Sequence, residues 1–242
     1  MEEDFIHCML FVTFVVIVLY IIIKPFMSST KLPFHIKRKF KANIENSDAV
    51  LDNMSFNGIP AIIYQSYTNN TNISSDIANI INENVSNNNE FEYYIFNNDD
   101  SRLFIESNFE EDILDAYDNL DLVSKNNLWK YCILYKNGGV YLDINISIKH
   151  NLITTITPAL SELPINNNII LTKNKNLISN KLIIAPPNLP IFKELIDSYL
   201  SNHVDTLSSL IEKYNYKNNI KFYVGDGYIK NINTNEIDFI IN

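Results

Sequence analysis

Glycine, histidine and cysteine are scarce in this chain of 242 residues, and their placement excludes several kinds of site. The five glycines form neither a Walker loop nor a dinucleotide-binding fingerprint, because both motifs need glycines at a close, fixed spacing. The four histidines are scattered, and none has the spacing of a zinc-binding helix or a catalytic triad. The two cysteines, Cys8 and Cys132, suggest no disulfide framework and fit a reducing compartment.

Basic residues are also fewer than acidic ones, with 19 Lys and Arg against 28 Asp and Glu. The net charge is −9 and the isoelectric point is near 4.9. A protein that binds nucleic acid usually presents a basic surface that neutralises phosphates. The composition therefore argues against nucleic acid as a partner, while the length suits a single domain with a sizeable core.

Charged residues are absent from Phe5 to Ile23. As a helix this run would be ~28 Å long, close to the hydrocarbon thickness of a bilayer. We predict a transmembrane anchor over 1–24, a stem over 25–57 and a folded domain over 58–242. A cleaved signal peptide is the alternative, although the acidic start of the chain lacks the positive charge of such peptides.

The charges around the predicted anchor indicate its orientation. Acidic residues precede it, and a cluster of basic residues follows it: Lys24, Lys31, Lys37, Arg38, Lys39 and Lys41. Basic flanks tend to stay on the cytoplasmic side of a membrane. We therefore expect a cytoplasmic C-terminal domain that is tethered to a lipid bilayer.

The stretch from Ser124 to Gly138 predicts a helix with a defined start and end. Ser124 can cap the first turn by accepting a hydrogen bond from a free backbone amide. Apolar side chains then recur at helical spacing: Leu128, Cys132 and Tyr135. Gly138 stands where a left-handed helix end needs a residue without Cβ.

After Gly139 the hydrophobic period changes to two, as in a strand. One face is apolar: Val140, Leu142, Ile144, Ile146 and Ile148. Asp143 and Asn145 share the other face, and on the preceding helix Asn127 and Lys130 lie three apart and share a face. If helix and strand pack together, these four side chains could converge on one pocket. On spacing alone, an ordinary half-buried strand with turn residues at its end is the better explanation.

The remaining segments alternate between strands and helices. We predict strands over 59–67, 92–97, 169–172 and 181–185, and helices from 74 or 75 to 84 and over 99–109, 110–120, 190–200 and 205–214. This alternation predicts an α/β fold with a mixed, largely parallel sheet flanked by helices. Ligands of such sheets bind at the carboxyl ends of strands, where Gln65 and Asp143 fall.

Three segments carry a resemblance to a known family. Leu128–Asn145 is similar to that family's sugar-binding segment, which ends in Asp-x-Asp. Ile59–Tyr67 is similar to its opening strand, Ile-Pro-x-Ile-Ile-His-Gln, and Phe91–Asp100 is similar to its second strand. They occur in the right order and cover most of residues 59 to 150. The chain thereby resembles the DxD glycosyltransferases typified by fungal initiating α-1,6-mannosyltransferases, and more remotely the large clostridial glucosylating toxins.

This resemblance implies a GT-A-like fold and a retaining hexosyltransferase that uses a nucleotide sugar. Its implied partners are a UDP- or GDP-sugar donor and a glycan, lipid or protein acceptor, with Mn²⁺ or Mg²⁺ as cofactor. Asp143 and Asn145 would bind the metal. The implied donor-binding residues are Gln65 facing the nucleoside, Asn127 and Lys130 on the sugar, and Tyr141 and Asp143 beside the donor and its ribose. No residue identifies itself as a nucleophile.

The chain departs from the family at three of these positions. Asn127 and Asn145 stand where the family has Asp, and Lys130 stands where it has Arg. The site thus has fewer carboxylates and no planar bidentate donor. Two hypotheses follow: a membrane-anchored, metal-dependent glycosyltransferase, or an inactive glycosyltransferase fold that serves as a membrane-tethered interaction or structural protein.

Overall fold

The computed structural model describes residues 55–67, 73–160, 169–174, 177–201, 203–214, 220–224, 228–230 and 237–241. The predicted anchor over 1–24 and nearly all of the predicted stem lie outside these ranges. Within them, no helix has both the length and the hydropathy to span a bilayer.

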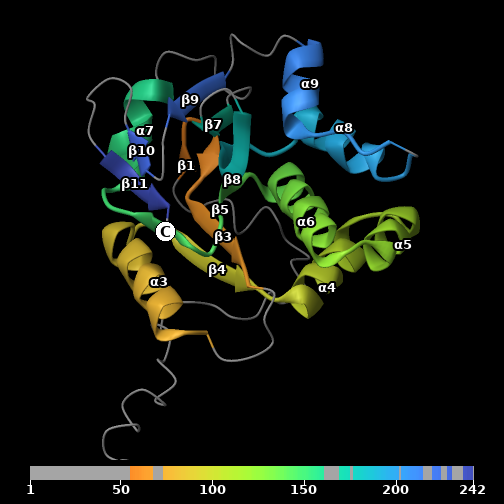
Figure 1. Ribbon diagram of the computed structural model, residues 1–242, viewed down its shortest axis with the longest axis horizontal. Helices are drawn as coiled ribbons and strands as arrows, with labels where there is room; N and C mark the ends of the chain where they lie inside the picture. The colour runs from red at the N-terminus through yellow and green to blue at the C-terminus, as the bar shows by residue number, and fades with distance from the viewer. Residues whose placement is uncertain are drawn as a thin grey trace, which may run out of the picture.

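A mixed sheet runs through the middle of the molecule, with the strand order β4-β3-β5-β8-β7-β9-β10-β11-β6 (Figure 1). Its strands are β3 (Ile62–Ser66), β4 (Glu92–Phe96), β5 (Gly139–Leu142), β6 (Ile146–Ile148), β7 (Ile169–Asn174), β8 (Leu177–Ala185), β9 (Ile220–Val224), β10 (Tyr228–Lys230) and β11 (Ile237–Ile241). A separate short hairpin pairs β1 (Ser55–Phe56) with β2 (Ile59–Pro60). The strands predicted over 92–97, 169–172 and 181–185 are confirmed as β4, β7 and β8, although β8 begins earlier, whereas the strand predicted over 59–67 divides into β2 and β3.

Parallel pairing is confined to β4, β3 and β5, and to β7 with β9. The other pairings between described strands of this sheet are antiparallel, so parallel pairs are fewer than we predicted. In the parallel group, Tyr64 of β3 lies beside Tyr141 of β5. The carboxyl ends of β3 and β5 therefore meet at one edge of the sheet, as the sequence indicated.

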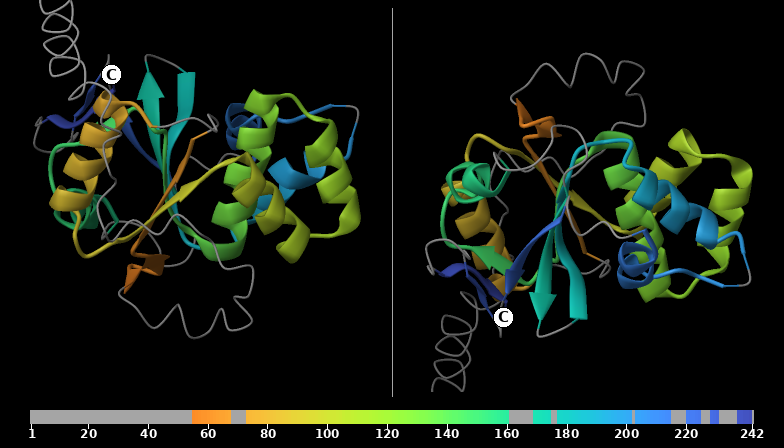
Figure 2. Two further views of the ribbon diagram at one scale, coloured as in Figure 1. Left: turned by 90° about the horizontal axis from the view of Figure 1, so that it is seen from below. Right: turned by 90° about the horizontal axis from the view of Figure 1, so that it is seen from above.

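Helices cover both faces of the sheet (Figure 2). One face carries α3 (Ser75–Asn87) and α7 (Leu152–Leu160), and the other carries α4 (Asn98–Asn108), α5 (Glu111–Asn119), α6 (Leu122–Asn137), α8 (Pro190–Ser198) and α9 (Leu207–Tyr214). Alternate strand residues enter the two cores. Val140 packs on the α3 side, and Tyr141 packs on the α6 side. The explanation favoured on spacing alone, an ordinary half-buried strand, does not hold for β5, because helices cover both of its faces.

Helix α6 begins earlier than predicted. Its N-cap is Asp121, whose carboxylate accepts hydrogen bonds from the amides of Val123 and Ser124 at 2.9 and 3.1 Å. The predicted cap, Ser124, instead lies within the first turn and donates its hydroxyl to Asp121. A carboxylate at this position also interacts favourably with the helix dipole, so it replaces the serine as cap.

The end of α6 at Gly138 is confirmed. This glycine has φ +65°, and a Cβ added there would lie 2.6 Å from the backbone nitrogen of Pro187. Both the left-handed backbone and the close approach require glycine. The chain therefore passes directly from α6 into β5, and this fixes the position of the strand relative to the helix.

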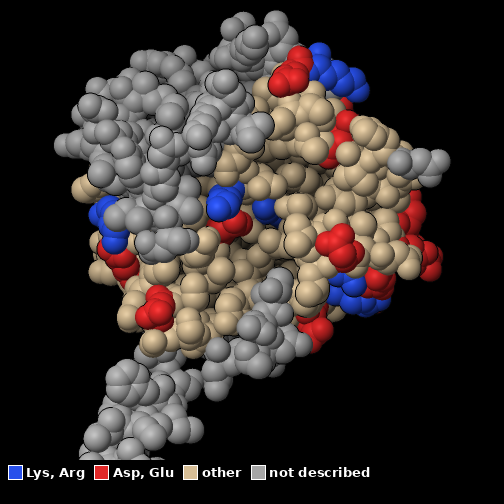
Figure 3. Space-filling view, in the orientation of Figure 1, with Lys and Arg blue, Asp and Glu red and all other residues tan. Residues whose placement is uncertain are grey.

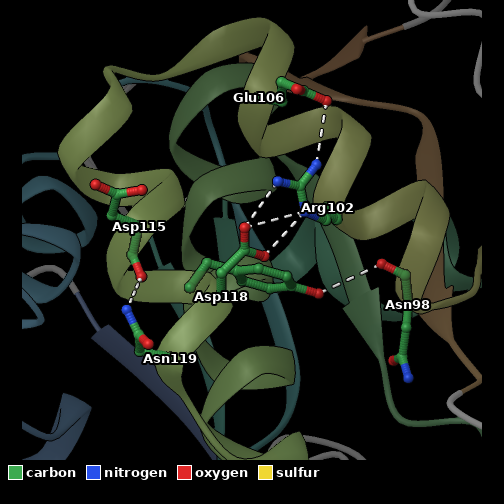
Figure 4. Close-up of polar contacts among 7 residues, drawn as sticks. Asn98, Arg102, Glu106, Asp115, Asp118 and Asn119 are labelled. Carbon is green, nitrogen blue, oxygen red and sulfur yellow. Dashed lines mark hydrogen bonds and ion pairs between the residues drawn. The ribbon is translucent and has the colours of Figure 1, made fainter.

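An ion-pair group joins α4 to α5 at the surface (Figure 4). Arg102 donates to both carboxylate oxygens of Asp118, with Nη2 to Oδ2 at 2.7 Å, and also reaches Glu106 at 3.4 Å. The side chains of Arg102 and Asp118 are 43% and 38% exposed. These charges are paired with one another while they remain in contact with water.

Candidate active site

The strand predicted from Val140 to Lys149 is two strands separated by a turn. β5 ends at Leu142, and the amide of Ile146 donates to the carbonyl of Asp143 at 3.0 Å, which closes a β-turn over Asp143–Ile146. β6 then pairs with β11 at the far edge of the sheet. The prediction that Asp143 and Asn145 share one strand face is therefore wrong, because both residues lie in this turn, at the carboxyl end of β5.

Tyr141 fixes the carboxylate of Asp143. Its hydroxyl donates to Asp143 Oδ1 at 2.8 Å and accepts a hydrogen bond from Asn126 Nδ2 at 3.2 Å. Ser66, at the end of β3, lies 3.4 Å from the same hydroxyl. Burial and then the nearby charge of Asp143 raise the pKa of Tyr141 well above its ordinary value. The phenol therefore stays protonated and keeps donating to the carboxylate.

Lys130 lies beneath this turn and is 2% exposed. Its ammonium donates to Asn127 Oδ1 at 3.3 Å and to the carbonyl of Asn180 at 3.1 Å, and it lies 4.4 Å from the centre of the Tyr141 ring. Burial lowers the pKa of Lys130 to about 8, and the charge of Asp143 opposes this effect. Figure 3 shows basic and acidic groups close together near the middle of this face, where Figure 1 shows α6, β5 and β8.

Helix α6 and strand β5 thus bring together Asn127, Lys130 and Asp143, three of the four side chains whose convergence the sequence predicted, and add Tyr141. Asn127 and Lys130 come from one face of α6, and Tyr141 and Asp143 come from β5 and its end. Asn180 of β8 joins them, since its Nδ2 donates to Asn127 Oδ1 at 3.2 Å. The convergence of helix and strand holds even though the predicted strand does not continue past Leu142.

Sequence reasoning missed Ser66, Asn126 and Asn180. All three are partly exposed, and all three contact predicted site residues. Nothing in their local pattern distinguishes them from ordinary surface residues. Asn180 lies near Asp143 because Leu142 of β5 pairs with Leu182 of β8, and the sequence alone does not reveal this pairing.

Gln65 does not face outward as predicted. Its side chain is 0% exposed, and its Nε2 donates to the backbone carbonyl of Asp143 at 3.2 Å. Its Oε1 accepts a hydrogen bond from the hydroxyl of Tyr93 at 2.6 Å. The predicted contact between this side chain and a nucleoside is corrected, because both ends of the amide are already bonded inside the protein.

The turn offers hard oxygen ligands for a cation. Asp143 supplies a carboxylate and Asn145 an amide oxygen, and both residues are partly exposed. Across the described parts of the chain, no group of three or more His, Cys, Asp or Glu residues could hold a metal ion. A cation at the turn would therefore need further oxygen ligands from a substrate or water.

Comparison with known proteins bears on this site. Residues 74–170 match the family described as "Glycosyltransferase sugar-binding region containing DXD motif". The match is to the sugar-binding region of the DxD glycosyltransferases and covers less than half of the chain. This region includes Asn127, Lys130, Tyr141 and the Asp143–Asn145 turn. The resemblance drawn from the sequence is confirmed.

One curated relative is an uncharacterized glycosyltransferase of Acanthamoeba polyphaga mimivirus, 27% identical over 156 residues. The alignment covers 62% of this chain and 57% of the relative, so the chain spans little more than half of that protein. Among solved structures, the PaToxG glycosyltransferase is 16% identical with a TM-score of 0.44, covering 66% of this chain and 65% of its own. A glycosyltransferase involved in glycosylating the major capsid of PBCV-1 is 11% identical with a TM-score of 0.38, covering 69% and 81%.

Proposed function

We propose that this protein transfers a sugar from a nucleotide-sugar donor bound at the Asp143–Asn145 turn. The observation that carries the proposal is the convergence of Asp143, Tyr141, Lys130 and Asn127 within the matched sugar-binding region. A UDP- or GDP-sugar is the proposed donor, and a glycan, lipid or protein is the proposed acceptor. We extend the proposal to a GT-A-like fold and a hexose transferred with retention of configuration.

The charges of the site suit a nucleotide sugar. The diphosphate of such a donor gains negative charge as the sugar leaves, and a buried cation stabilises that charge strongly because little water screens it. Lys130 provides this cation. Its described hydrogen bonds go to two neutral oxygens, Asn127 Oδ1 and the carbonyl of Asn180. The amides of Asn127 and Asn180 can donate to and accept from sugar hydroxyls.

A divalent cation fits the turn as a second source of positive charge. DxD glycosyltransferases generally use divalent metals, and Asp143 with Asn145 would hold Mg²⁺ or Mn²⁺ through one carboxylate and one amide oxygen. Tyr141 keeps the carboxylate oriented by donating to Oδ1. Because Asn145 brings no formal charge, we expect weak cation binding in the absence of the donor diphosphate.

The inactive-scaffold alternative is less well supported. A polar side chain that is buried without a ligand role costs stability unless it is fully bonded. The side chain of Lys130 carries a charge and is only 2% exposed beside the proposed donor-binding turn. This is expected for a site that still receives an anionic ligand. The membrane anchor over 1–24, the stem over 25–57 and the cytoplasmic placement of the domain over 58–242 also stand as proposals.

Donor hydrolysis tests the proposed function. The wild type should release UDP or GDP from one of a panel of nucleotide sugars in the presence of Mn²⁺, and Asp143→Ala should lower the rate by at least ~100-fold. Asp115→Ala is the matched control, because Asp115 is an exposed carboxylate on α5 (Figure 4), and α5 lies apart from β5 in Figure 1. Equal rates for wild type and Asp143→Ala would contradict catalysis at this turn.

A further inference from the structure

Two buried amides hold the Asp143–Ile146 turn from inside the protein. Gln65 Nε2 of β3 donates to the carbonyl of Asp143 at 3.2 Å, and Asn84 Nδ2 of α3 donates to the carbonyl of Ile146 at 2.8 Å. Both side chains are 0% exposed. The first and last residues of the turn are therefore each fixed by a hydrogen bond from a different element.

Tyr93 of β4 connects the two amides. Its hydroxyl donates to Gln65 Oε1 at 2.6 Å and accepts from Asn84 Nδ2 at 3.3 Å, and its side chain is 3% exposed. Burial raises the pKa of Tyr93 above its ordinary value, so the hydroxyl remains a donor. We refer to Gln65, Tyr93 and Asn84 as the turn clamp.

The phenol determines which way the Gln65 amide points. Because Tyr93 donates to Oε1, the Nε2 group must face the carbonyl of Asp143. A flipped amide would place two oxygens against one another at the turn and would leave the phenol without its acceptor. Removing the Tyr93 hydroxyl would leave Gln65 Oε1 without this donor, so the amide and the peptide group that follows Asp143 would be held less firmly.

We infer that the turn clamp positions the donor-binding turn; this rests on the proposed function of the turn itself. Three buried polar side chains converge from α3, β3 and β4, where apolar residues would fill the same core without needing partners. Their hydrogen bonds end on the two residues that bound the β-turn containing Asp143 and Asn145. A rotation of the Asp143 peptide would move its carboxylate away from the Tyr141 hydroxyl, which lies at 2.8 Å.

Tyr93→Phe removes the connecting hydroxyl and keeps the ring. We expect kcat/KM for donor hydrolysis to fall about 10-fold, mainly through a higher KM, as for the loss of a buried hydrogen-bond network. We also expect the amide of Ile146, which donates to Asp143, to exchange its hydrogen faster than in the wild type.

Two variants serve as controls. Tyr94→Phe removes the next phenol on β4, which donates to Glu92 at 2.5 Å, away from the turn. Asn87→Ala removes an amide that joins α3 to the carbonyl of Ile148 at 2.8 Å without touching the turn. Both controls should keep the wild-type KM and the wild-type exchange at Ile146, even where they lower the melting temperature.

Each outcome decides the inference. Faster exchange at Ile146 together with a raised KM, in Tyr93→Phe alone, supports a positioning role. If the Ile146 amide of Tyr93→Phe exchanges as slowly as in the controls, the clamp does not hold the turn. If it exchanges faster but KM equals that of the controls, the clamp has no role in donor binding. If the wild type turns over no donor at all, the proposed function fails together with the positioning role, and the exchange result still shows whether the clamp holds the turn.

Discussion

Charged side chains are treated in opposite ways in two regions of this molecule. On the α4–α5 surface, Arg102 is bonded to Asp118 and Glu106, and the Arg102 and Asp118 side chains remain more than a third exposed (Figure 4). Near the Asp143–Asn145 turn, Lys130 is 2% exposed and is bonded to neutral oxygens. Water already solvates the surface pair, whereas the buried ammonium has lost that solvation. The surface pair needs no further partner for its charges, whereas the buried ammonium would gain from the anionic ligand that we propose for this site.

The largest expected effect on stability lies in the apolar core on the α6 side, against which the charged regions can be compared. Phe192 of α8 is 0% exposed and stacks against Tyr131 of α6 with ring centres 6.3 Å apart. Phe192→Ala should lower the free energy of unfolding by about 3–5 kcal/mol, because it leaves a cavity. Chemical denaturation measures this loss, and donor affinity of the folded protein should not change.

Leu122→Ala is the control for that prediction. Leu122 is 57% exposed at the start of α6, so its removal should change stability little. If Leu122→Ala and Phe192→Ala were equally destabilising, the assignment of stability to the buried core would be wrong.

The second prediction concerns the buried charge itself. Lys130→Met keeps a side chain of similar length and removes the ammonium. Stability at pH 7 should stay close to that of the wild type, because the desolvation cost disappears together with the hydrogen bonds. Affinity for the donor nucleotide should fall about 10- to 100-fold, as for the loss of a charge-assisted hydrogen bond. Lys136→Met, at an exposed position of the same helix, should change neither quantity.

Lys130 also predicts a dependence on pH. Its pKa is about 8 in the folded protein, below the ordinary lysine value of 10.5, so the unfolded chain binds more protons between these values. Stability of the wild type relative to Lys130→Met should therefore rise as the pH increases from about 8 towards 10, and should be flat below pH 7. Thermal unfolding of both proteins between pH 7 and 9.5 measures this difference. An identical pH profile for the two proteins would show that Lys130 titrates normally.

The smallest effect is expected at the α4–α5 surface. Arg102→Gln removes the ion pairs to Asp118 and Glu106, but water screens these charges and the long side chains regain freedom. Chemical denaturation should give a change close to the error of repeated measurements. A loss similar to that of Phe192→Ala would show that the surface pair contributes to stability as the core does, and the contrast between the two regions would fail.

Local physical chemistry accounts for the parts of the fold that the sequence predicted. Ser74 caps α3 through its hydroxyl, Gly138 ends α6 with a positive φ, and the apolar run that opens residues 62–66 gives β3. Each of these features depends on residues only a few positions apart. A single sequence therefore contains the information that they need.

The features that the sequence did not predict depend on distant partners. The strand ends before Asp143 because the amide of Ile146 closes a turn on the carbonyl of Asp143 and because residues 146–148 pair with β11. Gln65 is buried because Tyr93 and the Asp143 carbonyl are both available to it. Neither contact leaves a periodic pattern in the chain, so amides such as Gln65 and Asn180 could be assigned only from the structure.

Nucleotide binding to the full chain tests the central claim most directly. Isothermal titration calorimetry with UDP and with GDP, each in the presence of Mn²⁺, should show saturable binding of one of them to the wild type. The isosteric variant Asp143→Asn should weaken that binding at least ~10-fold, because a charged ligand oxygen is replaced by a neutral one. Equal affinity of the wild type and Asp143→Asn, or no binding of either nucleotide at millimolar concentration, would contradict a donor site at this turn.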